Sequence, residues 1–332
     1  MKICIVGAGA IGGLMAVKLA DRGHDICVVA RGAQLAAINA SGLTLKEGDT
    51  TINARVRASA RMADFGAQDL VILGIKAHQL SAIVQDLPCL YGPDTMVLTA
   101  QNGIPWWYFC KTGGPFAGHH LQSVDPDGKI ATHLPADRVI GTVIYPAAEV
   151  IAPGIIQHIE GHRISLAEID NSETSRLQAL SDALREAGFK APMVSDIRSE
   201  IWTKLWGNLS FNPISALTGA TLAGLCQFPL TRALAGAMMR EAQGVGESLG
   251  IRFRISIEKR LAGGEAVGEH KTSMLQDVEA GRLLEADALL GSVIELGQMT
   301  KVPTPHLDAV YALVKLLDAR VQKAHAHRKA GA

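Results

Sequence analysis

The first twelve residues constrain the fold more than any other part of the chain. Lys2–Val6 is a short apolar run that predicts a buried strand, and glycines follow it at once in the run G-A-G-A-I-G. Ala10–Asp21 then predicts a helix that opens directly from this loop. A helix N-terminus reached through a glycine-rich turn offers backbone N–H groups and the positive end of the helix dipole to a dinucleotide pyrophosphate. A plain glycine-rich turn is the alternative interpretation. The candidate cofactor-binding residues are Gly7, Ala8, Gly9, Ala10, Ile11 and Gly12.

Strand and helix signals continue to alternate through roughly the first hundred residues, and this alternation predicts a parallel, doubly wound sheet. The segment Leu43–Ser59 alternates apolar and polar residues and predicts a pair of extended segments. Further strands are expected at Asp25–Ala30, Asp69–Ile75 and Thr95–Ala100, and helices at Gln34–Asn39 and His78–Leu87.

The residues that follow three of these strands are candidates for the cofactor site, because ligands in such sheets bind beyond the carboxyl ends of the strands. The second strand ends in Val28-Val29-Ala30-Arg31, which supplies a cation and no acidic residue at the position where NAD-specific sites usually place one. An arginine can hold the 2′-phosphate of NADP, whereas a carboxylate would repel it. NADP (NADPH) is therefore the expected cofactor, unless Arg31 is simply a surface residue. Lys76 and Asn102 follow two other strands, and they either face the cofactor or are ordinary loop residues.

The second half of the chain changes character near residue 195. Strands are expected at Val139–Ile144, Ile155–His158 and Arg163–Leu166, whereas nearly everything after Ile197 predicts helix. We expect an NADP-binding Rossmann-type domain over 1–195, a helical substrate and catalytic domain over 196–320, and a flexible tail over 321–332. The predicted fold class is α/β, with an N-terminal Rossmann-like doubly wound domain followed by an all-helical C-terminal domain.

A row of polar residues recurs every fourth position at the start of the helical half. The row consists of Glu200, Lys204, Asn208 and Asn212, and large apolar residues surround it. Four-residue steps place these groups on one side of a helix. Because the neighbours are apolar, we expect the row to face a partly buried cleft. A lysine among carboxamides suits the binding and protonation of a polar small molecule. The alternative is a partly exposed helix from which Lys204 reaches solvent.

Composition excludes several classes of function. The chain has 332 residues, with 32 basic and 32 acidic side chains and a formal net charge of +0, so no electrostatic footprint for nucleic acid or an anionic membrane is expected. No apolar run approaches the roughly 20 residues of a membrane span. The five cysteines form no C-x-x-C pair, which fits a reducing, cytoplasmic setting. No metal site is predicted, since the tail histidines His325 and His327 would hold a metal only loosely.

Six sequence elements, in order along nearly the whole chain, resemble the ketopantoate reductase (2-dehydropantoate 2-reductase) family. The N-terminal ones are the glycine loop with Arg31, the pair Lys76-Ala77, and Gln101-Asn102-Gly103. The C-terminal ones are Lys204-x-x-x-Asn208-x-x-x-Asn212-Pro213, Thr272-Ser273-Met274-Leu275-Gln276-Asp277 and Gly281-Arg282-x-x-Glu285-x-Asp287.

The resemblance implies an enzyme with its active site between a Rossmann domain and a helical domain. It implies NADPH-dependent reduction of a 2-oxo acid to a 2-hydroxy acid, as in pantothenate biosynthesis, with Lys204 as the catalytic proton donor and Glu285 as its partner carboxylate. Without the family pattern, Glu285 would be read as a surface ion pair with Arg282. The implied substrate-binding residues are Asn102, Asn208, Asn212 and Ser273. Lys76 is implied near the nicotinamide end of the cofactor, and Asn102 is a candidate for cofactor binding as well.

One segment departs from the family pattern and leaves the substrate open. Trp106-Trp107-Tyr108-Phe109 and the loop that follows to about residue 137 are longer and more aromatic than the family pattern. These aromatic residues are either a packing anchor or a reshaped crevice for another 2-oxo acid. The leading substrate is ketopantoate. The alternatives are a paralogous NADPH-dependent reductase of another branched or aromatic 2-oxo acid, and a non-catalytic NADP-binding sensor. The expected partner is the small-molecule substrate, with no nucleic acid and no membrane, and a homodimer remains open.

Overall fold

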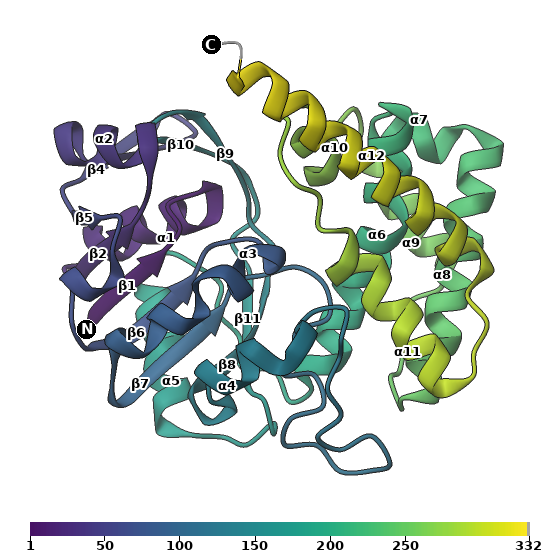
Figure 1. Ribbon diagram of the computed structural model, residues 1–332, viewed down its shortest axis with the longest axis horizontal. Coiled ribbons are helices and arrows are strands. Elements are labelled where there is room, and N and C mark those ends of the chain that lie inside the picture. Colours follow the sequence, from purple (N-terminus) through teal and green to yellow (C-terminus); the bar gives the residue numbers. More distant parts are fainter. Residues whose placement is uncertain (331–332) are drawn as a thin grey trace. The chain divides into compact units, whose positions relative to one another are not determined.

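The computed structural model describes the backbone of residues 1–330 and the side chains of residues 1–324. Its main feature is a seven-stranded sheet in the order β11-β8-β7-β6-β1-β2-β5 (Figure 1). All neighbouring strands run parallel except β11, which pairs antiparallel with β8. The strands are β1 (Lys2–Val6), β2 (Asp25–Val29), β5 (Arg57–Ser59), β6 (Gln68–Leu73), β7 (Tyr91–Thr99), β8 (Val139–Ile144) and β11 (Ile164–Glu168).

This strand order confirms the predicted doubly wound sheet. Taken in chain order, the parallel strands of this sheet lie as 3-2-1-4-5-6, the order of a dinucleotide-binding Rossmann sheet. The chain leaves β1 toward β2 on one side and returns to β6 on the other. The crevice at the carboxyl end of β1 is therefore the topological switch point, where ligands bind in such folds.

A second, four-stranded sheet covers helix α1 (Ala10–Asp21), and the sequence did not predict it as a sheet. Its order is β4-β3-β10-β9, from β3 (Leu43–Glu47), β4 (Thr50–Ala54), β9 (Ala147–Ala152) and β10 (Ile155–Glu160). The helix packs against all four of these strands as well as β1 and β2. Residues Gly12 to Leu19 are consequently all buried, although they include Lys18. The sequence predicts extended segments in the regions of β3, β4 and β10, but neither the strand β9 nor the pairing of β3 with β10.

The remaining helices of this half are α2 (Gly32–Ser41), α3 (Ala77–Ile83), α4 (Lys129–His133) and α5 (Ser175–Glu186). The single helix predicted over His78–Leu87 is wrong in its second half. There α3 gives way to a 3₁₀ segment, Val84–Leu90, which contains Pro88. Proline lacks an N–H group and disfavours α geometry in the residue before it.

The aromatic segment Trp106–Phe109 is a packing anchor. All four rings are buried, with Trp107 only 1% exposed. The indole N–H of Trp107 lies 3.4 Å from Thr99 Oγ1 on β7. The guanidinium of Arg198 lies over the Trp107 ring and donates a 2.7 Å hydrogen bond to the carbonyl of Tyr108. Such contacts fix the segment within the N-terminal half and confirm the packing interpretation.

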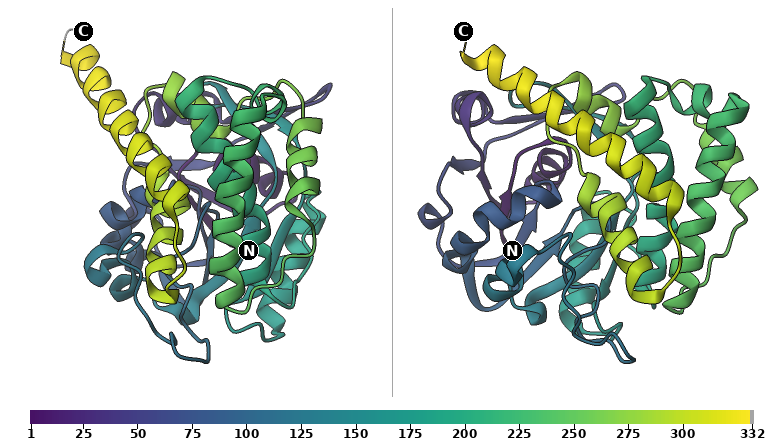
Figure 2. Two further views of the ribbon diagram at one scale, coloured as in Figure 1. Left: turned by 90° about the vertical axis from the view of Figure 1, so that its right-hand side faces the viewer. Right: turned by 45° about the vertical axis from the view of Figure 1, so that its right-hand side comes forward.

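The C-terminal half is built of helices, and no strand occurs in its described residues (Figure 2). Its centre is α8, which packs against α7, α9, α11 and α12. The helices are α6 (Ile197–Thr218), α7 (Leu222–Gln227), α8 (Pro229–Ser248), α9 (Ile257–Ala266), α10 (Ser273–Glu279), the π-helix η5 (Asp287–Gly291), α11 (Ser292–Thr300) and α12 (Pro305–Ala330). The tail expected at 321–332 overlaps the end of α12, and residues 331–332 lie outside the described residues.

By their contacts the residues form two compact units. The first unit comprises 1–101, 106–120 and 127–200, and the second comprises 102–105, 121–126 and 201–332. Two loop segments that precede residue 195 thus belong with the helical unit. The amides of Gln122 and Ser123 each donate a 2.8 Å hydrogen bond to the carboxylate of Glu295 on α11, which holds one of these segments there.

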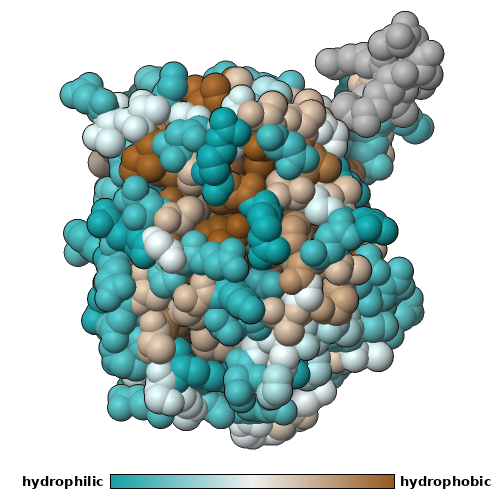
Figure 3. Space-filling model, turned by 90° about the vertical axis from the view of Figure 1, so that its left-hand side faces the viewer, coloured by the Kyte–Doolittle hydropathy of each residue, from teal (hydrophilic) through white to brown (hydrophobic). Residues whose placement is uncertain are grey.

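Among the described residues, no helix combines the length and the apolar character that a membrane span needs. Polar residues dominate the face of the molecule drawn in Figure 3, with apolar residues visible between them in its upper half.

Candidate active site

The glycine loop after β1 is packed too tightly for side chains at two of its glycines. Gly7 has φ +101°, and a Cβ there would lie 2.5 Å from Cγ2 of Ile75. A Cβ on Gly12 would lie 2.0 Å from the carbonyl oxygen of Gly7. Such contacts are far inside van der Waals distance, so the turn and the first turn of α1 can close only with glycine at these positions.

The N-terminus of α1 has the features of an anion site. Gly9 is its N-cap, so no side chain caps the helix, and its first turn contains no acidic residue. Gln34, on α2, donates a 2.7 Å hydrogen bond to the carbonyl of Ala8 and accepts one of 2.9 Å from the amide of Gly154. These contacts of Gln34 hold the glycine loop in place, and the backbone N–H groups at the uncapped end of α1 suit a pyrophosphate. Gln34 was not predicted, because its partners lie far away in sequence.

Two predicted basic residues follow the strands that flank β1. Arg31 is exposed and lies between β2 and α2, where it is the N-cap of that helix. Lys76 follows β6, is half-buried and is the N-cap of α3, with its amide 3.1 Å from Oε1 of Gln79. Because β2 and β6 run parallel to β1 on either side of it, Arg31 and Lys76 follow the same edge of the sheet as the glycine loop.

The helical unit brings together three of the predicted site residues in one hydrogen-bonded chain. Lys204 Nζ donates to Oδ1 of Asn102 at 2.7 Å, across 102 positions of sequence. The amide nitrogen of Asn102 lies 3.4 Å from Oε2 of Glu285, 183 positions away. Glu285 is only 8% exposed, whereas Lys204 and Asn102 are half-buried. The result is a cation, an amide and a carboxylate in a partly desolvated cluster.

Burial changes the acidity of the lysine in this cluster. Desolvation of the ammonium lowers the pKa of Lys204 from 10.5 to about 8, and the negative charge of Glu285 opposes the shift. A lysine with a pKa near 8 is still largely protonated at neutral pH but releases its proton more readily than an exposed one. Lys204 therefore has the acidity expected of a general acid that works near neutral pH.

The loop that carries Asn102 is fixed by the π-helix after Glu285. The amide of Ile104 donates to the carbonyl of Ala288 at 3.0 Å. Gly103, at φ +89°, approaches the same carbonyl so closely that a Cβ would lie 2.2 Å from it. π-Helical turns often occur at functional sites because they shift the register of a helix locally. Here η5 holds the loop beside Glu285, a role that no sequence pattern indicated.

The other predicted substrate-binding residues lie farther along α6. The side-chain amide of Asn212 is buried and lies 3.4 Å from the hydroxyl of Ser273, the first residue of α10. Thr272 caps α10 by accepting from the amide of Leu275 at 3.3 Å, which leaves the Ser273 side chain exposed. Asn208 is half-buried and lies one helical turn from both Lys204 and Asn212. Their roles stay predictions.

Two interpretations of charged residues are wrong. Glu200 does not join the row of Lys204, because its Oε1 accepts 2.7 Å hydrogen bonds from Arg163 and Ser165, both within the first unit. Glu285 is not the surface partner of Arg282. It is buried, and the Arg282 guanidinium instead pairs with Asp277 at 2.9 Å.

Comparison with known families agrees with this arrangement over almost the whole chain. Residues 3–171 match the family model described as ketopantoate reductase PanE/ApbA, and residues 196–318 match the model of its C-terminal domain. A 2-dehydropantoate 2-reductase of Mesorhizobium japonicum is 54% identical over 318 residues, which cover 96% of this chain and 98% of the relative.

Solved structures share the fold. A crystal structure from Ralstonia solanacearum, provisionally described as a ketopantoate reductase, has 41% identity and a TM-score of 0.91 and covers 95% of this chain and 97% of its own. D-mandelate dehydrogenase, solved with NADH and anilino(oxo)acetate, has 23% identity and a TM-score of 0.82, with coverages of 97% and 99%, and is similar at the level of the fold. Matches to both family models and a relative of this identity and coverage establish that the chain belongs to the ketopantoate reductase family of oxidoreductases.

Proposed function

We propose that this protein reduces ketopantoate to pantoate with NADPH, and that Lys204 donates the proton. The observation that carries the proposal is the chain from Lys204 through Asn102 to Glu285, together with the lowered pKa of the lysine. The 54% identity to a 2-dehydropantoate 2-reductase supports this substrate.

The residues of the first unit would bind the cofactor. The glycine loop and the uncapped N-terminus of α1 suit the pyrophosphate. Arg31 suits the 2′-phosphate that distinguishes NADPH from NADH. The bound cofactor supplies the hydride that reduces the ketone. Lys76 and Asn102 are the proposed contacts near its nicotinamide.

The residues of the second unit would act on the substrate. As the ketone is reduced, negative charge develops on its oxygen, and an ammonium directed at this oxygen stabilises the charge and then transfers a proton to it. Asn102 holds Nζ of Lys204 through a 2.7 Å hydrogen bond. Glu285 keeps the cluster electrostatically balanced and can accept from a substrate hydroxyl. Asn208, Asn212 and Ser273 can satisfy the remaining substrate oxygens without adding charges that would have to be desolvated.

The first test is the rate of NADPH oxidation with ketopantoate, for the wild-type protein and for Lys204→Met. Methionine keeps the apolar stem of the lysine and removes the ammonium. Loss of a general acid lowers kcat by about 10²- to 10⁴-fold. Lys259→Met, on the exposed side of α9, is the matched control and is expected to keep wild-type turnover. Near-wild-type kcat in Lys204→Met would show that the proton comes from elsewhere.

A different 2-oxo acid is the second candidate, because the similarity to D-mandelate dehydrogenase shows that this fold also serves an aromatic 2-hydroxy acid. A panel of branched and aromatic 2-oxo acids, each measured with NADPH and with NADH, separates the two. Turnover confined to an aromatic acid would replace ketopantoate and leave the role of Lys204 intact. Tight NADPH binding with no turnover of any acid would instead indicate a sensor.

A further inference from the structure

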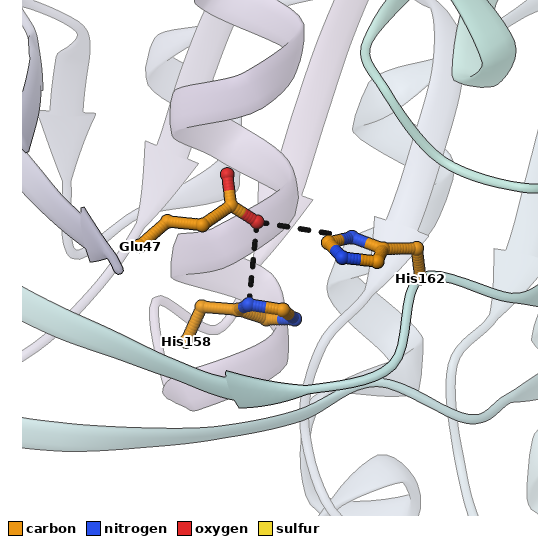
Figure 4. Close-up of side chains that lie close together, drawn as sticks. All are labelled: Glu47, His158 and His162. Atoms are coloured by element: carbon orange, nitrogen blue, oxygen red, sulfur yellow. Dashed lines mark ion pairs between the residues drawn. The ribbon is translucent and has the colours of Figure 1, made fainter. Parts of the chain in front are cut away.

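Three potential metal ligands converge at one end of the second sheet. Glu47 is the last residue of β3, His158 lies in β10, and His162 follows β10 after a turn at Gly161, which has φ +76°. Figure 4 shows the two imidazoles directed toward the same carboxylate oxygen of Glu47. Strand β10 pairs directly with β3, so sheet formation itself brings the three side chains together. All three lie in the first unit, and the proposed reaction uses none of them.

The distances in this cluster suit a small cation. Oε1 of Glu47 lies 3.2 Å from Nδ1 of His158 and 3.7 Å from Nδ1 of His162. One ligand atom from each of the three residues lies within 4.8 Å of the others. Tetrahedral zinc with bonds of about 2.0–2.2 Å holds its ligand atoms about 3.4 Å apart. Small rotations of the side chains would therefore complete a three-ligand site.

Two of the converging atoms lack a hydrogen-bond partner among the described residues. These are Oε1 of Glu47 and Nδ1 of His162, and both atoms are buried. Buried polar atoms in folded proteins nearly always have a hydrogen-bond partner, and a bound ion is one of the recognised explanations for an exception. The polar neighbours of these two atoms at ion-pair distance are each other and Nδ1 of His158, so the lone pairs of these atoms converge on one place. That place suits a ligand that accepts lone pairs.

The outer contacts orient the ligands for this purpose. Nε2 of His158 lies 2.7 Å from the carbonyl oxygen of Gly161, so Nε2 must carry the hydrogen, and in a neutral ring Nδ1 presents its lone pair to Glu47. A metal-binding histidine typically donates its other N–H group to a carbonyl or carboxylate in this way. Lys18 Nζ holds the second carboxylate oxygen of Glu47 at 2.8 Å, which leaves Oε1 for the cation.

We propose that Glu47, His158 and His162 bind a divalent transition-metal ion of the zinc type. Two imidazoles and one carboxylate favour zinc or its neighbours over calcium and magnesium, which prefer all-oxygen sites. The His162 side chain is 42% exposed, so the ion can enter from solvent and keep a water as its fourth ligand. The ion would join β3 to the turn after β10 and so stabilise the sheet that covers α1.

The test titrates the full-length protein with Co²⁺ and Zn²⁺. Co²⁺ binding is followed by the visible absorption of four-coordinate cobalt, and Zn²⁺ binding by the rise in unfolding temperature. His162→Ala removes an exposed ligand, and Glu47→Gln keeps an acceptor for Lys18 while it removes the charge. The double variant His325→Ala/His327→Ala is the control for metal bound by the tail. We expect one saturable site in wild type and in the tail variant. We expect affinity reduced by at least about tenfold in the two site variants.

Three outcomes would overturn the proposal. They are unchanged Co²⁺ absorption and Zn²⁺ stabilisation in His162→Ala and Glu47→Gln, loss of binding only in the tail variant, and no saturable binding by wild type. The apo form of His162→Ala is expected to oxidise NADPH with the proposed substrate at the wild-type rate. The metal site and the reductase site are therefore tested independently.

Discussion

Lys204 differs from an ordinary surface lysine in what surrounds its ammonium. It is half-buried on α6, its Nζ is hydrogen-bonded to Asn102, and the buried carboxylate of Glu285 is its charged neighbour. Desolvation outweighs the attraction of Glu285, so the pKa falls to about 8. The sequence supplied the lysine and the helix that carries it. The depth of burial and the partner on a loop 102 positions away required the folded chain.

The lowered pKa predicts the pH dependence of the reaction. The proposed reduction uses the protonated form of Lys204, which is present below about pH 8 and lost as the pH rises through that value. We expect kcat/KM for reduction to fall above about pH 8 and that for oxidation of the product to rise, because the reverse reaction needs the neutral amine. Initial rates measured in both directions across this range check the prediction. A flat profile through pH 8 would remove Lys204 from the proton transfer.

Arg31 carries the prediction on cofactor choice. It is exposed at the start of α2, where no acidic residue of the same strand end competes for it. Charge-assisted hydrogen bonds contribute about 1.5–3 kcal/mol, so Arg31→Ala should raise KM for NADPH by about 10- to 100-fold and leave KM for NADH nearly unchanged. Arg22→Ala, an exposed arginine after α1, is the control. An equal rise in KM for NADPH and for NADH would mean that Arg31 does not bind the 2′-phosphate.

At the scale of elements, α1 shows how one helix serves both packing and the site. It packs against strands of both sheets, and residues 12–19 are buried on every side of the helix. Gly12 lets its first turn approach the glycine loop. A Cβ on Gly13 would lie 2.7 Å from side-chain atoms of Ile156 of β10, so the second sheet packs closely against the helix at this glycine. The glycine loop and the second sheet, which covers α1, thus contact the helix through the adjacent residues Gly12 and Gly13.

Gly12→Ala tests the contact between α1 and the glycine loop. The alanine Cβ would lie 2.0 Å from the carbonyl oxygen of Gly7. This oxygen belongs to the backbone, so it cannot move aside as the end of a flexible side chain could. We expect a loss of about 1–3 kcal/mol in the free energy of unfolding and weaker NADPH binding, because the helix must shift away from the loop. Gly263→Ala, within α9 and with open space around its Cβ position, is the matched control and should be neutral or slightly stabilising. Urea unfolding and cofactor titration measure both effects. Equal behaviour of the two variants would contradict the packing argument.

The role of the aromatic segment and the length of the helix after β6 could not be predicted from the sequence. The four aromatic residues of Trp106–Phe109 could line a binding crevice or fill the protein core, and the sequence alone does not distinguish these two roles. Burial and the stacking of Arg198 over Trp107 decided for the interior. In the segment after β6, the helical period extended past Ile83, but Pro88 and the start of β7 at Tyr91 cut it short.

At the scale of the whole molecule, the chain forms two compact units that differ in secondary structure. The first holds both sheets and the glycine loop, and the second holds the helices with Lys204 and Glu285. Short segments of the loop after β7 belong to the second unit, and one of them carries Asn102. This assignment explains how a residue that follows a sheet strand comes to bond to the lysine of a helix.

The sequence by itself determined what depends on local patterns. Apolar runs, glycines and helical spacing fixed the parallel sheet, the loop at its first strand, the helical second half and the four-residue row from Lys204 to Asn212. Each of these patterns involves residues close together in sequence, so it can be recognised without the tertiary structure.

Only the tertiary structure decided what depends on distant pairs. It joined β3 to β10, directed Glu200 to Arg163, placed Asn102 between Lys204 and Glu285, and gathered Glu47 with His158 and His162. Strand partners and side-chain partners far apart in sequence leave no periodic signal, because chain topology and packing select them among many residues of similar chemistry.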